Sequence, residues 1–188
     1  WHMRINLPNG LTIARILMVP LMVIAFYLPF RGTNLIAAAM FTIAAITDWL
    51  DGYLARRYQQ TSDFGAFLDP VADKLAVTVA LFLIVQADKT ALMAVTAAII
   101  VGREITISAL REWMAAIGER TKVGVAWLGK VKTVVQMIAI IILLMQHRYV
   151  GKPLYWFGKA LLIAAAALTI WSAVVYLRAA WPVIRSRA

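Results

Sequence analysis

The chain has 188 residues, of which 63% are apolar and only 15% are charged, and its formal net charge is +10. Soluble domains are about half apolar and about a quarter charged, so this composition favours a membrane protein. The chain contains no cysteine, which excludes disulfides and thiolate metal sites, and its two histidines leave little scope for histidine chemistry.

Six apolar segments follow one another along the chain, at about 11–29, 35–50, 71–87, 91–110, 131–146 and 160–177. They are long, rich in Ala, Leu and Met, and do not alternate, so each predicts a helix and not a strand. Helices that are apolar all round lie inside protein or lipid. The predicted fold is therefore all-α, a polytopic membrane protein with six transmembrane helices. Most charge-free cores are shorter than the ~20 residues of a full span, and the alternative is a soluble protein with six buried helices.

The length predicts a single membrane domain over residues 1–188. Trp1 and His2 precede Met3 and have the position expected of a cloning remnant. The first apolar segment lacks a small-residue cleavage site and is followed by further apolar segments, so we expect no cleavable signal peptide.

The basic residues divide unequally between the two ends of these segments. In an up-and-down bundle, one end holds all but five of the nineteen Lys and Arg residues, the exceptions being Arg31, Lys89, Arg148, Lys152 and Lys159. The positive-inside rule makes the richer end cytoplasmic and places both termini there. We therefore expect a multi-pass protein of the inner, or cytoplasmic, membrane. Because the basic residues flank apolar segments, their expected partners are anionic lipid headgroups, with no nucleic acid.

Acidic residues gather at this same end. Asp48 and Asp51 are three residues apart and so share a helix face, and Asp69 and Asp73 are four apart at the start of the next segment. On consecutive antiparallel helices, the four carboxylates can converge. Converged carboxylates repel one another, and hard cations such as Mg²⁺, Mn²⁺ or Ca²⁺ relieve the repulsion. The pattern predicts a metal site of these four aspartates, against the alternative of a solvated interfacial loop.

Two neighbours of the aspartates suit a phosphate. Gly52 has no side chain, so a ligand can approach its backbone closely. Arg56 follows just over one helical turn later and can bind a phosphate with its guanidinium. Carboxylates, metal and arginine together indicate a substrate that contains a diphosphate.

The same stretch resembles the signature of the CDP-alcohol phosphotransferase family, D-x₂-D-G-x₂-A-R-x₈-G-x₃-D-x₃-D. With every spacing kept, its fixed positions are here Asp48, Asp51, Gly52, Ala55, Arg56, Gly65, Asp69 and Asp73. LPNGLTIAR near the start also resembles bacterial members of the family. GREITISALREWMAAIG and GKVKTVVQM resemble later segments of those members that use glycerol 3-phosphate. The resemblance therefore extends across the chain.

The resemblance implies a six-helix membrane enzyme, usually a homodimer, that transfers the phosphatidyl group of CDP-diacylglycerol to glycerol 3-phosphate and releases CMP. It implies that Asp48, Asp51 and Asp69 bind two divalent metals, Mg²⁺ or Mn²⁺. Asp73 completes the acidic site and is implied to be the general base. The residues implied to contact the cytidine diphosphate portion or line the nucleotide pocket are Gly52, Arg56, Asn9 and Thr12.

The implied acceptor, glycerol 3-phosphate, carries its own phosphate, and cations are needed to bind that phosphate. Arg103 and Arg111 lie on the fourth segment, and Lys130 and Lys132 begin the fifth at the same end. We predict that these four residues bind the acceptor phosphate. An arginine at this depth costs a few kcal/mol, so the alternative for Arg103 is a salt bridge or snorkelling to the interface. For the other three the alternative is an ordinary flanking charge. Glu104 is expected to orient cations or to face water.

Two other functions stay open. The first is the same chemistry on another acceptor, namely phosphatidylglycerol (a cardiolipin synthase), an inositol compound or serine. A lipid acceptor would need a wide lateral groove instead of a small basic pocket. The second is a non-enzymatic cation carrier, which should show internal repeats and polar groups near the midplane. The sequence shows no repeat, and its polar groups crowd one end.

Overall fold

The computed structural model describes residues 7–58, 63–118 and 126–187, and these ranges contain helices and short turns only. The helices are α1 (Leu7–Tyr27), α2 (Thr33–Tyr58), α3 (Asp63–Ala87), α4 (Ala91–Ala116), α5 (Ala126–Met145), α6 (His147–Val150) and α7 (Lys152–Arg187). The predicted all-α fold is confirmed, and each predicted segment lies on one long helix, except that the first and fifth segments run two residues and one residue past the ends of α1 and α5. Trp1 and His2 lie outside the described residues.

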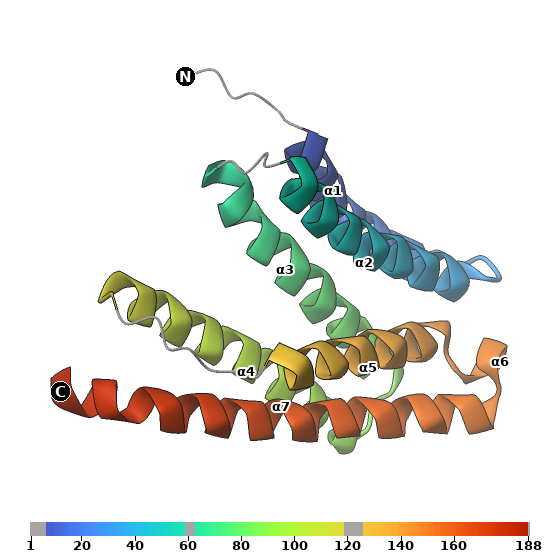
Figure 1. Cartoon of the computed structure of the whole chain (residues 1–188). Coiled ribbons are helices and arrows are strands. Elements are labelled where there is room, and N and C mark those ends of the chain that lie inside the picture. Colours follow the sequence, from blue (N-terminus) through green and yellow to red (C-terminus); the bar gives the residue numbers. More distant parts are fainter. Residues whose placement is uncertain (1–6, 59–62, 119–125, 188) are drawn as a thin grey trace.

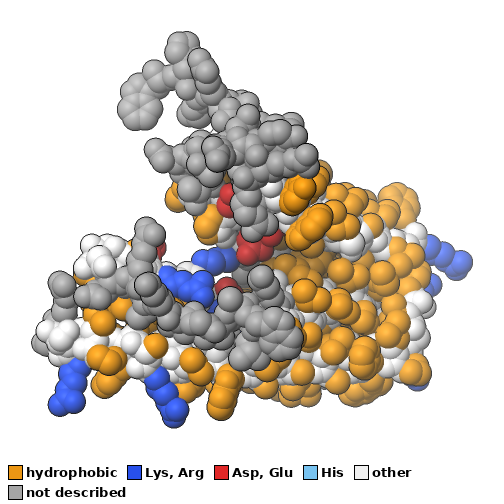
Figure 2. Space-filling view, in the orientation of Figure 1, with side chains coloured by type: hydrophobic (Ala, Val, Ile, Leu, Met, Phe, Trp, Pro, Cys, Tyr) orange, Lys and Arg blue, Asp and Glu red, His pale blue; other side chains and the backbone are white. Residues whose placement is uncertain are grey.

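The outer surface of the bundle is apolar. Candidate membrane spans lie in α1, α2, α4 and α7, at Asn9–Tyr27, Thr33–Asp51, Ala91–Ala116 and Lys152–Ser186, and α5 adds the shorter apolar helix Val131–Met145. Within the described residues α3 is not among them. Large apolar side chains such as Leu17 and Trp49 are 60% and 68% exposed, and hydrophobic side chains are spread over the right-hand part of the face in Figure 2. Such a surface suits lipid, as in a multi-pass membrane protein.

The helices form two groups that α3 connects. α1 packs against α2 and α3, while α7 packs against α4 and α5; α2 and α3 also contact α5. In Figure 1, the α1–α2 pair and the α4–α5–α7 group diverge toward the side on which α1 begins and α7 ends, and α3 crosses between them. The C-terminal end of α4 therefore faces three other helix ends: the N-terminal ends of α1 and α3 and the C-terminal end of α2.

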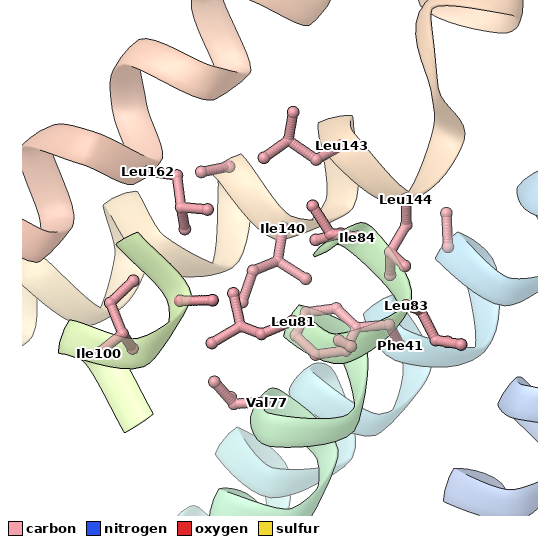
Figure 3. Close-up of a cluster of buried hydrophobic side chains, with 14 of the residues drawn as sticks. Phe41, Val77, Leu81, Leu83, Ile84, Ile100, Ile140, Leu143, Leu144 and Leu162 are labelled. Carbon is pink, nitrogen blue, oxygen red and sulfur yellow. The ribbon is translucent and has the colours of Figure 1, made fainter. Parts of the chain in front are cut away.

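The packed core lies where the two groups of helices meet (Figure 3). Phe41, Leu81, Ile100, Ile140 and Leu162, one from each of five helices, are at most 2% exposed. Each lies in the half of its helix away from the acidic stretch. In lipid, helices associate through close packing, and this packing fixes one end of the bundle. The acidic end contributes none of these five side chains.

A buried ion pair lies beside the core, at the end of the bundle opposite the acidic stretch. Lys159 Nζ lies 2.7 Å from Asp88 Oδ2, and the two side chains are 8% and 9% exposed. Tyr155 Oη donates to the same carboxylate over 3.2 Å. Burial would raise the pKa of Asp88, but hydrogen bonds from Lys159 and Thr90 and the charge of Lys159 outweigh it and hold the pKa below the ordinary 3.8. Lys159, which the sequence places among the flanking charges, is therefore a buried partner.

Lys159→Met is expected to destabilise the bundle by about 3–5 kcal/mol near neutral pH, because it leaves Asp88 as an unpaired buried charge. The lowered pKa means that the wild-type pair contributes fully above about pH 4, near the pKa of the unfolded state, and loses this contribution as the pH falls below it through the lower pKa of the folded protein. Thermal unfolding in detergent at about pH 7 and pH 3 measures both effects. The gap between the two proteins should narrow at the lower pH, and an unchanged gap would contradict the role of the pair.

Candidate active site

Arg15 of α1 joins three of the four predicted aspartates. Its Nη2 lies 2.9 Å from Asp51 Oδ2 and 3.6 Å from Asp69 Oδ1, and its Nη1 donates to Asp48 Oδ1. The side chains of Arg15 and Asp51 are only 3% and 5% exposed, whereas those of Asp48 and Asp69 are 44% and 52% exposed. One buried guanidinium thus gathers carboxylates from α2 and α3 at the open end of the bundle.

Helix geometry explains why these groups meet. Thr12 and Arg15 are three residues apart on α1 and share a face, as Asp48 and Asp51 do on α2. Because α1 packs against both α2 and α3, that face reaches both acidic helices. Thr12 Oγ1 donates to Asp69 Oδ1 over 2.6 Å, and Arg15 Nη2 lies 3.4 Å from Thr12 Oγ1. The α1 face therefore contacts all three of these carboxylates directly.

Asp73 lies one turn beyond Asp69 on α3 and borders two cavities. The first is also lined by Arg15 and Asp48. The second has a volume of about 60 Å³, and its polar lining residues are Asp73, Lys74, Thr78, Glu104, Lys132, Thr133 and Gln136. Acidic and basic side chains meet at this hollow in Figure 2. Asp73 therefore lies between an acidic centre, formed by Asp48, Asp51 and Asp69, and a basic pocket, which is the second cavity with Lys132.

Glu104 of α4 joins Lys132, which lines the second cavity, to Arg103, which is not among the described residues that line it. Its Oε1 accepts hydrogen bonds from Arg103 Nη1 over 2.8 Å and from Lys132 Nζ over 2.9 Å. Arg103 Nη2 also donates to Ser172 Oγ of α7 over 2.9 Å. The expectation that Glu104 orients cations therefore agrees with its contacts. Arg103 forms its salt bridge with Glu104, and its phosphate-binding role stays a prediction.

The surroundings of the aspartates indicate how far these side chains suit a divalent metal ion. Within the described residues, no group of three or more Asp, Glu or His side chains is close enough to hold a metal ion, and Arg15 lies among the three aspartates. Asp51 Oδ1 is buried without a hydrogen-bond partner, which costs about 1–3 kcal/mol. The donor type, three carboxylates with one unpaired oxygen, is the type that a hard divalent ion prefers, but around Arg15 these carboxylates are not close enough to one another to hold an ion without rearrangement.

The other predicted residues are spread over the same end. Asn9 is 7% exposed and precedes Thr12 by three residues, so it shares the α1 face next to the aspartates. Arg111 lies further along α4, with its guanidinium carbon 5.5 Å from the centre of the Tyr176 ring. It is not among the described residues that line the 60 Å³ cavity. The predicted residues whose side chains lie outside the described part of the structure are Gly52, Arg56 and Lys130.

Two residues at the site have no role in the sequence analysis. Arg15 counts there only as one of the basic residues at the cytoplasmic end, although a charge inside an apolar segment is by itself a sign of function. Gln136 is 5% exposed, lines the basic cavity and has a buried Oε1 without a partner. It follows Lys132 by four residues and therefore shares its face of α5, a pattern that could have indicated it.

These features define a multi-pass helical membrane protein with an acidic centre and a basic pocket at one end. The chain matches the CDP-alcohol phosphatidyltransferase family over residues 5–171, and it belongs to that family. The resemblance of its aspartate signature is thus confirmed. Enzymes of this family generally depend on a divalent metal.

Similar curated proteins are bacterial and match over nearly their whole length. The CDP-diacylglycerol–glycerol-3-phosphate 3-phosphatidyltransferase of Sodalis glossinidius is 50% identical over 95% of this chain and 96% of its own length. The proteins of the same name from Haemophilus influenzae and Pseudomonas fluorescens are 51% and 48% identical; the matches cover 95% and 96% of this chain and 95% and 93% of those proteins.

Proposed function

We propose that this enzyme transfers the phosphatidyl group of CDP-diacylglycerol to glycerol 3-phosphate, giving phosphatidylglycerophosphate and CMP in phospholipid biosynthesis. The observation that carries the proposal is the position of Asp73, which borders both the cavity of Arg15 and Asp48 and the cavity of Glu104 and Lys132. The acidic side suits a metal-bound diphosphate, and the basic side suits the phosphate of the acceptor. The names of the similar bacterial proteins support this reaction.

The donor is proposed to bind on the acidic side. Asp48, Asp51 and Asp69 would hold two divalent metal ions, Mg²⁺ or Mn²⁺, with Asp73 at the edge of the same site. When bound, these ions would supply positive charge that stabilises negative charge on the diphosphate. The contact of Thr12 with Asp69 supports a donor site beside α1. The residues proposed for the nucleotide portion are Asn9, Thr12, Gly52 and Arg56.

Asp73 is proposed as the general base. It accepts the proton of the acceptor hydroxyl while that oxygen forms a bond to the lipid-linked phosphorus. The bond between this phosphorus and the bridging oxygen of the diphosphate breaks, and CMP leaves with the electron pair. A base must reach its proton directly or through one water, and Asp73 lines the cavity proposed for the acceptor. General-base help contributes about 10²–10⁴ in rate.

The acceptor phosphate is proposed to bind at Arg103 and Lys132, with Arg111 and Lys130 as further cations at the same end. Glu104 already holds the first two side chains in place, so their positions are set before the substrate arrives. The Lys132 side chain is 6% exposed, and a buried cation interacts more strongly with an anion than an exposed one does.

Arg103→Ala and Lys132→Met are each expected to raise the KM for glycerol 3-phosphate about tenfold to a hundredfold, with little change in the KM for CDP-diacylglycerol. The reason is the loss of one charge-assisted phosphate contact, worth about 1.5–3 kcal/mol. Steady-state kinetics with each substrate varied in turn measures the effect. Arg178→Ala removes an exposed cation near the end of α7 and serves as the control. Unchanged acceptor kinetics in both variants would contradict the basic pocket.

The reaction itself is tested by following CMP release from CDP-diacylglycerol with a panel of acceptors. Glycerol 3-phosphate should be used far better than phosphatidylglycerol or serine, because the cavity is bordered by two cations, Lys74 and Lys132, and neither of those acceptors carries a phosphate monoester. A preference for phosphatidylglycerol would assign the chain to a different acceptor class. Absence of CMP release with every acceptor would contradict the proposal.

We also propose that the six long helices all span the inner membrane, with both termini cytoplasmic, and that residues 1–188 form one domain that acts as a homodimer. The four candidate spans and the shorter apolar helix support several crossings. The family match over residues 5–171 supports a single domain. A cytoplasmic site fits the substrates, since glycerol 3-phosphate arrives from water while the acyl chains of the donor stay in lipid.

A further inference from the structure

We infer that Arg15 is the internal counter-ion of the metal site: it holds Asp48, Asp51 and Asp69 together before metal binds, and it competes with metal for their oxygens. This inference rests on the proposed metal site and adds a residue that opposes metal binding there.

The competition follows from the atoms that Arg15 contacts. Its two terminal nitrogens approach one oxygen each of Asp48, Asp51 and Asp69. A divalent cation needs carboxylate oxygens at about 2.0–2.6 Å. An ion that gathers these same oxygens therefore lies where the guanidinium lies now. The two positive groups cannot occupy that place together, so Arg15 has to give up at least one carboxylate when metal binds.

The contacts of Arg15 also leave polar atoms unpaired. Its buried Nε has no hydrogen-bond partner, and neither does the buried Oδ1 of Asp51 beside it. Both terminal nitrogens of Arg15 are paired, so its charge offsets the repulsion of the three carboxylates, while its Nε and one oxygen of Asp51 stay without a partner. The free oxygen of Asp51 is a position at which an entering cation can begin to bind.

Arg15 should therefore weaken metal binding and stabilise the metal-free protein. Without its charge, the three carboxylates repel one another unopposed across α2 and α3, so the metal-free bundle loses stability. A divalent ion then meets three negative charges with no cation to displace. Even at the dielectric constant of water, one positive charge about 6 Å from a divalent ion lowers the affinity for that ion by about tenfold.

The test is Mn²⁺ binding to the full chain in lipid nanodiscs without substrates, followed by the electron paramagnetic resonance signal of free Mn²⁺. Arg15→Gln removes the charge and should bind Mn²⁺ about tenfold more tightly than wild type. Arg15→Lys keeps the charge and should bind close to wild type. Lys152→Met removes an exposed cation at the opposite end of the bundle and should leave the affinity unchanged. Unchanged or weaker binding by Arg15→Gln would overturn the inference.

A second measurement covers the case in which Arg15→Gln is unstable without metal. Purified in Mg²⁺ and then treated with chelator, the variant should lose more thermal stability than wild type does, since metal replaces the missing charge. If it fails to fold even in Mg²⁺, metal cannot replace Arg15 and the inference is wrong. Failure of wild type to bind Mn²⁺ would instead contradict the proposed metal site itself.

Discussion

Excess chelator is expected to abolish CMP release from CDP-diacylglycerol, and added Mg²⁺ or Mn²⁺ to restore it. Without metal, the donor diphosphate meets the carboxylates of Asp48, Asp51 and Asp69, whose charge is offset by Arg15 among the described residues. Metal stabilisation of developing charge is worth several kcal/mol, and about 5 kcal/mol corresponds to several thousandfold in rate. Turnover with chelator should therefore fall to background.

Asp51→Asn should produce a loss of the same order. Asp51 is the most buried of the three aspartates, and its Oδ1 has no partner within the described structure and is therefore available to a metal ion. Glu112→Gln, on an exposed position of α4, is the matched control and should keep full activity. Thermal unfolding of both variants checks that the bundle is intact. Full turnover in excess EDTA, or in Asp51→Asn, would exclude the metal site.

Asp73→Asn is expected to lower kcat by about 10²–10⁴, the usual contribution of a general base, while metal and donor still bind. The amide keeps the size of the carboxylate but cannot accept the acceptor proton. Asp73 has no direct contact with Arg15 in the structure, whereas the other three aspartates do. Its replacement should therefore disturb the acidic centre least among the four.

Single-turnover rates together with Mn²⁺ and CDP-diacylglycerol affinities separate these effects. The two affinities should change by less than about threefold in Asp73→Asn, a change below about 1 kcal/mol. Asp69→Asn is the internal comparison, one turn earlier on α3, and should lose metal affinity along with rate. Near-normal turnover in Asp73→Asn would show that another group takes the proton, and a joint loss of metal binding would make Asp73 a ligand instead.

The local features of this protein follow from its sequence because they depend on neighbours along one helix. Backbone groups in lipid must find partners within their own segment, so long apolar runs predict helices, and α4 begins at the residue where its predicted segment starts, with Thr90 capping Met93 N. The spacing of Asp48 and Asp51 places both on one face for the same reason. The family signature then supplies the roles of the aspartates, which spacing alone does not.

The pairing between helices was decided only by the tertiary structure. Arg15 meets Asp48 and Asp51 across separations of 33 and 36 residues, and Glu104 meets Lys132 across 28. No periodicity along one helix specifies which faces of two helices touch, because this depends on how side chains pack where the helices cross. Lys159 shows the difference most clearly: in the sequence it is a flanking charge, and in the structure it becomes the buried partner of Asp88, in the turn between α3 and α4.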